Sequence, residues 1–301
     1  MVVMSLIFLS LPTTYMAQKP AHVLDLTKLL ENYAERRIIE TAQFVFDVME
    51  KGWYNPEKRG IRTIQRVRLM HASMRHLIMH SIEHDPEDMA YPWKDEWGLP
   101  ISQEDMLATL QTFSLEVIHG LERLGIHLNQ QEMDDWFFAW EKIGQILGVE
   151  PDLLPRNRAQ AQHIQNMIYE QLFMKNNEPG EKLIKALVKT IKDLSPSNFL
   201  KKHVLVIMRY MIDNDDWYFN YLKLPGGAQH RFFLFLMTIA MHIYGWLARI
   251  TGGSNSFVAK HAMHLLNGIY NAERGGKDAS FLVPDDLCEL WNLERKLSHK
   301  H

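Results

Sequence analysis

The sequence gathers histidine and arginine side chains in one short stretch, RVRLMHASMRH at residues 66–76. If this stretch is helical, Arg68, His71 and Arg75 share one face at positions i, i+3 and i+7. Val67 and Met74 lie beside them, so the surroundings of the histidine are apolar. A neutral imidazole can bind a metal ion, and guanidinium groups pair with carboxylates. The face therefore offers what a haem needs: one iron ligand, apolar walls and cations for two propionates.

The same spacing fits an interpretation without a cofactor. Between Ile61 and Ile82 the chain has no acidic residue, so the arginines have no partner on their own helix. They could pair with carboxylates of neighbouring helices, and His71 would then be a hydrogen-bonded core histidine. Spacing alone favours this second interpretation.

A second polar group precedes it in AERRIIETAQFVFDVM, residues 34–49. Helical spacing puts Arg37, Glu40, Thr41 and Phe44 on one face. Arg37 and Glu40 could form an ordinary surface ion pair. They could equally form a polar wall over a cofactor, with Glu40 as a proton acceptor and Arg37 or Thr41 as hydrogen-bond donors to bound oxygen. Spacing does not choose between the two.

Other histidines give weaker signals. His76, His80 and His84 recur every four residues and could clamp a metal, but they point away from the His71 face, which favours a solvated or packing edge. Glu116 and His119 have the ExxH spacing of a carboxylate-bridged di-iron protein. Such sites need two copies of that motif, and the sequence holds one.

Composition indicates a folded globular chain. Of the 301 residues, 47% are hydrophobic and 23% charged, and the formal net charge is −3. There is no basic stripe interleaved with aromatic residues, so nucleic acid is not expected as a partner. Cys288 is the single cysteine, which excludes an internal disulfide and a thiolate metal cluster. Any metal must be held by histidine or carboxylate.

Helical periodicity dominates, and we expect an all-α fold with one helical domain over residues 1–301. Helices are predicted at 24–51, 61–84, 103–125, 130–148, 157–175, 179–193, 197–212, 228–250, 255–272 and 284–298. Ser102 followed by Asp105 predicts a capping box where the third begins.

Two apolar segments could each form either a helix in the protein core or a segment that contacts a membrane. Residues 1–18 lack the basic start of a secretory signal and show helical spacing, so a core helix is predicted, with a signal or membrane contact through residues 1–16 as the alternative. Residues 232–248 are short for a membrane span and carry His242 at their middle, so a buried central helix is predicted. We therefore expect a cytoplasmic protein, with peripheral membrane association or secretion less favoured.

Several stretches, in order, resemble one enzyme family: SLIFLSLPTTY, ERRIIETAQFVFDVM, GIRTIQRVRLMHASMRH, GLPISQEDMLATLQTFS and GLERLGIHL. The chain resembles the latex-clearing proteins and the fungal oxygenase that cleaves the farnesyl chain in mycophenolic acid biosynthesis. The resemblance covers roughly residues 5–128. It implies a haem b protein with a globin-like helical core, in which His71 is the proximal iron ligand. This replaces the core-histidine interpretation.

The resemblance also implies that Arg37 and Thr41 lie on the distal side of the haem, and that Thr109 or Thr112 faces it. Some rubber-cleaving members have a lysine immediately before that threonine, where this chain has Glu40. Rubber itself therefore does not follow as the substrate. The implied function is a haem-dependent oxygenase acting with O2 on an apolar unsaturated substrate of isoprenoid or lipid type, with an external donor for any electrons needed. The alternative is a haem or gas-binding protein of the same fold without enzymatic activity.

Overall fold

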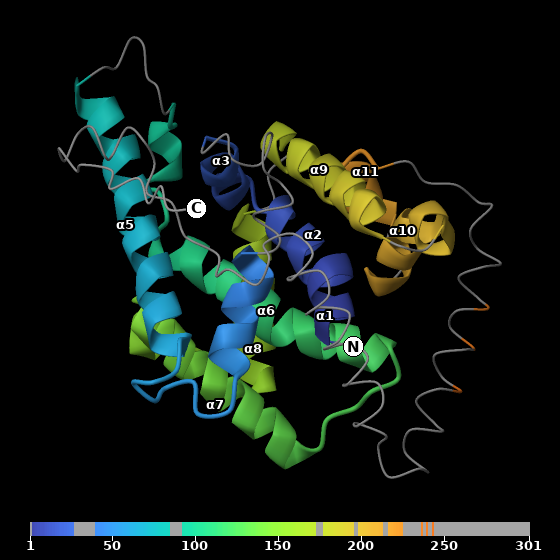
Figure 1. Ribbon diagram of the computed structural model, residues 1–301. Helices are drawn as coiled ribbons and strands as arrows, with labels where there is room; N and C mark the ends of the chain where they lie inside the picture. Colours follow the sequence, from blue (N-terminus) through green and yellow to red (C-terminus); the bar gives the residue numbers. More distant parts are fainter. Residues whose placement is uncertain are drawn as a thin grey trace, which may run out of the picture.

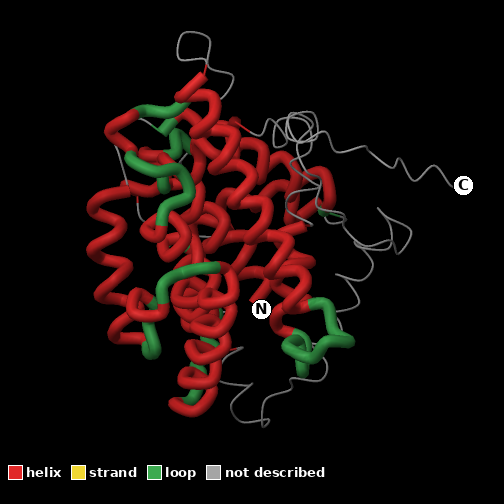
Figure 2. Tube along the Cα trace, turned by 90° about the vertical axis from the view of Figure 1, so that its left-hand side faces the viewer, coloured by secondary structure: helices red, strands yellow, loops and turns green. Residues whose placement is uncertain are grey.

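A computed structural model describes residues 2–26, 40–84, 92–172, 177–195, 198–212 and 216–224, together with Leu236, Ile239 and Ile243. Within these ranges the chain is helical and forms no strand (Figures 1 and 2). This confirms the predicted all-α class. The elements are α1 (Val2–Ser5), the π-helical turn η1 (Leu6–Ser10), α2 (Leu11–Met16), α3 (Gln18–Leu26), helical residues 40–49, α5 (Gly60–His84), η2 (Asp95–Trp97), α6 (Gln103–Arg123), α7 (Gln130–Leu147), η3 (Pro151–Leu153), α8 (Arg158–Leu172), α9 (Glu178–Leu194), α10 (Asn198–Met211) and α11 (Asp216–Tyr221).

Local capping explains why most predicted helices end close to where they were expected. The Ser102 side chain accepts from the Asp105 amide while the Asp105 carboxylate accepts from the Ser102 amide, which is the predicted capping box. Asn129 and Glu132 form a second box at the start of α7. That helix ends at Gly148, whose left-handed φ of 102° suits glycine.

The N-terminal helical segment lies in the centre of the fold. Every residue from Ser5 to Lys19 is buried except Ile7, which is half-buried. Pro12 lacks the amide that would bond to the Phe8 carbonyl, which accounts for the π-helical turn just before it. The Thr14 hydroxyl meets that of Thr112 on α6 at 2.8 Å. The predicted core helix is thus confirmed from Ser5 to Met16, and the helix is interrupted at Ala17, whose backbone is extended.

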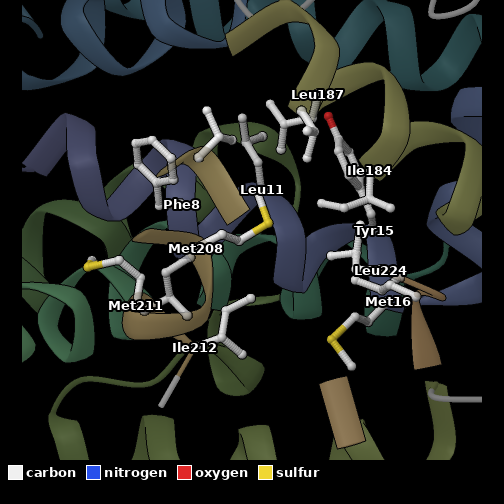
Figure 3. Close-up of a cluster of buried hydrophobic side chains, with 14 of the residues drawn as sticks. Phe8, Leu11, Tyr15, Met16, Ile184, Leu187, Met208, Met211, Ile212 and Leu224 are labelled. Atoms are coloured by element: carbon white, nitrogen blue, oxygen red, sulfur yellow. The ribbon is translucent and has the colours of Figure 1, made fainter. Parts of the chain in front are cut away.

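Two large hydrophobic clusters meet at this central segment. One face packs against α9, α10 and α11 (Figure 3), where the labelled side chains are Phe8, Leu11, Tyr15, Met16, Ile184, Leu187, Met208, Met211, Ile212 and Leu224. The other face contributes Leu6 and Ala17 to a cluster with residues of helix 40–49 and of α5 to α8. The central segment therefore joins both halves of the described fold.

The predicted helix at 232–248 lies largely outside the described residues. The three residues described there, Leu236, Ile239 and Ile243, are helical, and their side chains are 46%, 42% and 53% exposed. For these three the prediction of burial is wrong. An apolar composition does not by itself distinguish a buried helix from one with an exposed apolar face.

Candidate functional site

The described parts of the two stretches singled out in the sequence form an antiparallel helical hairpin. Helix 40–49 and α5 are joined by residues 50–59; in Figure 1 they are the unlabelled blue helix beside the α6 label and the cyan helix at the left, connected at their lower ends. Above that connection the two helices diverge. At the closed end, a Cβ on Gly60 would lie 2.7 Å from the Trp53 carbonyl oxygen and 2.9 Å from that of Asp47, so only glycine fits there.

A buried polar contact sets the register of this hairpin. The Thr63 hydroxyl donates to Asp47 Oδ2 at 2.7 Å, and Gln43 Nε2 donates to the other carboxylate oxygen at 2.6 Å. Both Asp47 and Thr63 are buried. Sequence reasoning missed them, although an acidic residue within the apolar run FVFDVM was a usable signal.

Because Thr63 is paired with Asp47, the predicted site residues on the two helices lie at about the same distance along the helix axes from this contact. Glu40 precedes Asp47 by seven residues, and Met70 follows Thr63 by seven, so both lie about 10 Å from the contact along their helices at 1.5 Å per residue. Thr41 and His71 are their immediate neighbours. The open end of the hairpin therefore carries His71 on one arm and Glu40 with Thr41 on the other.

The middle of α5 lacks close packing just where His71 lies. No residue from Gln65 to Ala72 is buried, whereas Ile64 on one side and Ser73 and Met74 on the other are fully inside the protein. His71 itself is half-buried, and its Nδ1 atom is shielded from solvent. The helix thus has a half-open inner surface over two turns around this histidine.

The opposite arm presents a buried carboxylate and an aromatic contact. Glu40 is 4% exposed and Thr41 is half-buried. Phe44, one turn later, packs edge-on against Phe113 of α6 with ring centroids 6.4 Å apart. Arg37 lies outside the described residues. Three of the four residues predicted for this face are therefore placed: Glu40 and Phe44 are buried, and Thr41 is half-buried.

The two arginines flanking His71 contact main-chain carbonyls. Arg68 Nη1 donates to the Ile146 carbonyl at 3.2 Å. Arg75 donates through Nε to the Pro100 carbonyl at 3.1 Å and through Nη2 to that of Ile101 at 2.6 Å. Both guanidinium groups thus have partners within the protein, and their pairing with propionates stays a prediction.

Thr109 and Thr112 differ in their surroundings. The Thr109 hydroxyl donates to the Asp105 carbonyl of its own helix at 2.9 Å. Thr112 is buried and uses its hydroxyl on the Thr109 carbonyl and on Thr14, each at 2.8 Å, so it faces the N-terminal segment. Contact of either threonine with a haem remains a prediction.

Glu116, the carboxylate of the ExxH motif, is bound within a protein network. It is 6% exposed and accepts from Gln165 Nε2 at 2.5 Å and from the Tyr169 hydroxyl at 3.0 Å, with His119 Nδ1 at 3.5 Å. Burial raises the pKa of Tyr169 well above its ordinary value, so the phenol keeps its proton. In the described part of the chain no group of three or more His, Cys, Asp or Glu side chains could hold a metal. The di-iron alternative gains no support.

The remaining histidines of α5 form a separate pair. The rings of His76 and His80 stack with centroids 5.9 Å apart and an interplanar angle of 25°. The side chain of His84 lies outside the described residues. This pair belongs to a different face of the helix from His71, as the sequence predicted from spacing.

Comparison with known proteins identifies the family. The family model described as "ER-bound oxygenase mpaB/B'/Rubber oxygenase, catalytic domain" matches residues 4–247, which is most of the chain and includes both arms of the hairpin. The chain belongs to this family. The resemblance noted in the sequence is thereby confirmed.

Two further comparisons, one with a curated protein and one with a solved structure, illustrate the relationship. A rubber oxygenase from Streptomyces sp. (strain K30) is 25% identical over 161 residues, which cover 52% of this chain and 37% of that protein. The match therefore spans little more than a third of the relative's length. A solved structure of latex clearing protein in the closed state aligns with a TM-score of 0.68 at 18% identity, covering 94% of this chain and 74% of that one. At this identity the second match establishes the shared fold.

None of the helices in the described ranges has both the length and the apolar character that crossing a bilayer requires.

Proposed function

We propose that this chain is an oxygenase that holds haem b through His71 and uses O2 to cleave an apolar, unsaturated substrate of isoprenoid or lipid type. One observation carries the proposal. In a member of the rubber oxygenase family, the hairpin register brings His71 level with Glu40 and Thr41, and the inner surface of α5 is left half-open at that level.

The residues present fit a haem in three respects. Iron in a haem needs one protein ligand, so a lone histidine suffices where a bare metal ion would need several. The Nδ1 atom of His71 is shielded from solvent, so a haem iron bound by this ring would be bound through Nε2. Met70, next to His71, is half-buried and supplies apolar surface at this point of α5. When bound, the haem iron would supply the site for O2 and the oxidising chemistry.

The chain's own residues would manage protons and water. Glu40 is sheltered from bulk water, which suits a carboxylate that removes a proton from an allylic carbon of the substrate. The hydroxyl of Thr41 and the guanidinium of Arg37 would donate hydrogen bonds toward oxygen. Phe44 and Phe113 would exclude water from the reacting carbons.

The proposed substrate class rests on the relatives, which are described as a rubber oxygenase and a latex clearing protein. Because Glu40 stands where some rubber-cleaving relatives have lysine, we propose an unsaturated isoprenoid of low molecular weight rather than rubber. Besides this substrate and O2, the only further reactant would be an external electron donor, if turnover needs one.

The test is a haem titration of the purified chain followed by absorbance spectra of the oxidised and reduced protein. Wild type should develop a Soret band and His71→Ala should lose it. With squalene as an unsaturated isoprenoid, wild type should consume O2 and form carbonyl products, and Glu40→Gln should keep the Soret band but turn over more slowly. A wild type without a Soret band in excess haem contradicts the proposal. A haem-loaded protein that consumes no O2 with squalene favours a haem or gas-binding role.

A further inference from the structure

Two backbone turns pack against α5 on either side of His71. The first is the end of α7, where Arg68 donates to the Ile146 carbonyl and lays its guanidinium group over Gly148. A Cβ on Gly148 would lie 3.3 Å from Cζ of Arg68, and its φ of 102° also disfavours any other residue. Any other residue at position 148 would therefore crowd the Arg68 guanidinium group and adopt an unfavourable φ.

The second turn precedes α6 and is held by Arg75. Its carbonyls, those of Pro100 and Ile101, both accept hydrogen bonds from this one guanidinium group. Ile101 has a φ of 52°, a strained value for a β-branched residue, while its side chain is buried in one cluster with Met74 of α5. Such a conformation persists only where its surroundings fix it, and Arg75 supplies two of the fixing contacts.

Gln103 joins the two turns to each other. Its Nε2 donates to the Gly148 carbonyl at 2.9 Å, and its Oε1 accepts from the Glu150 amide at 2.9 Å. Both polar atoms of the amide are therefore engaged, which fixes its orientation. The contacts run from Arg68 through the end of α7 and Gln103 to the turn held by Arg75, and so they return to α5.

We infer that Arg68, Gln103 and Arg75 form a clasp that fixes the orientation of His71 toward its cofactor. His71 lies three residues after Arg68 and four before Arg75, between the two attachment points. No residue from Gln65 to Ala72 is buried, and the hydrophobic packing of this stretch comes from the partly buried Val67, so it restrains the rotation of α5 only weakly here. The hydrogen bonds of the clasp fix the rotation of α5 around His71, and its three members are positioning residues. This inference rests on the proposed function.

The test compares Gln103→Ala and Arg75→Gln with Arg66→Gln, a matched control on an exposed position of the same helix. Each full-length variant is loaded with haem, and two quantities are measured: the rate of haem release to excess apomyoglobin, and the iron–histidine stretching frequency in the resonance Raman spectrum. Loss of a clasp member should speed release about tenfold or more and shift or broaden the stretching band, as for other residues that orient metal ligands. Arg66→Gln should match wild type in both.

Wild-type release rates and an unchanged stretching band in both clasp variants would overturn the inference. If Arg75→Gln does not fold, Gln103→Ala decides alone, because it leaves the Ser102–Asp105 capping box intact. If wild type takes up no haem, the proposed function fails, and the clasp is then judged by hydrogen exchange of residues 66–76 in the apoprotein. There Gln103→Ala should exchange faster than Arg66→Gln, and equal rates would refute the clasp.

Discussion

Asp105 is a carboxylate held out of water where α3 meets the start of α6. It is 4% exposed, and Oδ1 lies 3.4 Å from Nζ of Lys19, which also binds Glu104 at 3.0 Å. Burial raises the pKa of Asp105 above its ordinary value of 3.8, although Lys19 and the hydrogen bonds with Ser102 act in the opposite direction. The folded state therefore favours the protonated form more than the unfolded chain does.

This shift predicts a pH dependence of stability with a definite sign. Because the folded-state pKa is the higher one, the stability that Asp105 contributes is complete below 3.8 and is lost as pH rises through the folded-state pKa. The free energy of unfolding of wild type, relative to that of Asp105→Asn, should fall as pH is raised from acid toward neutrality. Urea unfolding at several pH values measures it. Glu104→Gln is the control for loss of an ion pair with Lys19. If the free energy of unfolding of wild type rises with pH relative to that of Asp105→Asn, the prediction is wrong.

For single residues, the sequence predicted which side chains share a helix face but not which groups they contact. Helical spacing placed Arg68, His71 and Arg75 on one face, and the structure places both arginines against turns that pack on the same helix. Their acceptors are main-chain carbonyls, which every residue carries, so no pattern of side chains could have indicated them. Gln103 was missed for the same reason, since both of its partners are backbone atoms.

The hairpin of helix 40–49 and α5 is the element on which the proposed site depends. Its register rests on the Thr63–Asp47 hydrogen bond, in which a buried hydroxyl satisfies a buried carboxylate oxygen. Removing only the hydroxyl leaves that oxygen without its donor, and an unsatisfied buried polar group is costly.

Thr63→Val removes the hydroxyl at nearly constant shape and should lower the free energy of unfolding by about 1–3 kcal/mol. Thr63→Ser keeps the donor and loses only a methyl group, so it should be less destabilising. Urea unfolding of the two variants and wild type gives both differences. Should the serine variant prove as unstable as the valine variant, the methyl group rather than the hydrogen bond would be what Thr63 contributes.

Helix ends were predicted well where residues within one turn of the end determine it. The capping boxes at Ser102 and Asn129 and the glycine at position 148 each act within one turn of chain, so sequence alone can indicate them. The arrangement of the helices is a long-range property. Both arms of the hairpin pack in one cluster with residues of α6 and α7, and periodicity carries no information about which helices pack together.

At the scale of the whole molecule, the N-terminal segment joins two hydrophobic clusters. Phe8, Leu11 and Met16 belong to the cluster with α9 to α11, whereas Leu6 and Ala17 belong to the cluster with α5 to α8. Unfolding of this segment would therefore expose apolar side chains of both clusters. We therefore predict that the described residues unfold as a single cooperative unit, and the single domain over residues 1–301 stays a prediction.

Cooperativity of this kind can be tested by destabilising one cluster and observing the other. Ile184 is fully buried in the α9 cluster, and Ile184→Ala should cost about 2–5 kcal/mol through lost contacts and a cavity. In one cooperative unit, the slowest-exchanging amides of α6 and α7 should lose as much protection as those of α9, because both exchange only through global unfolding.

Ile143→Ala, in the other cluster, is the reciprocal variant. Hydrogen exchange with mass spectrometry measures both halves at once. Faster exchange confined to α9 and α10 in Ile184→Ala would instead mean that the two clusters unfold separately and that the site-bearing half is a domain by itself.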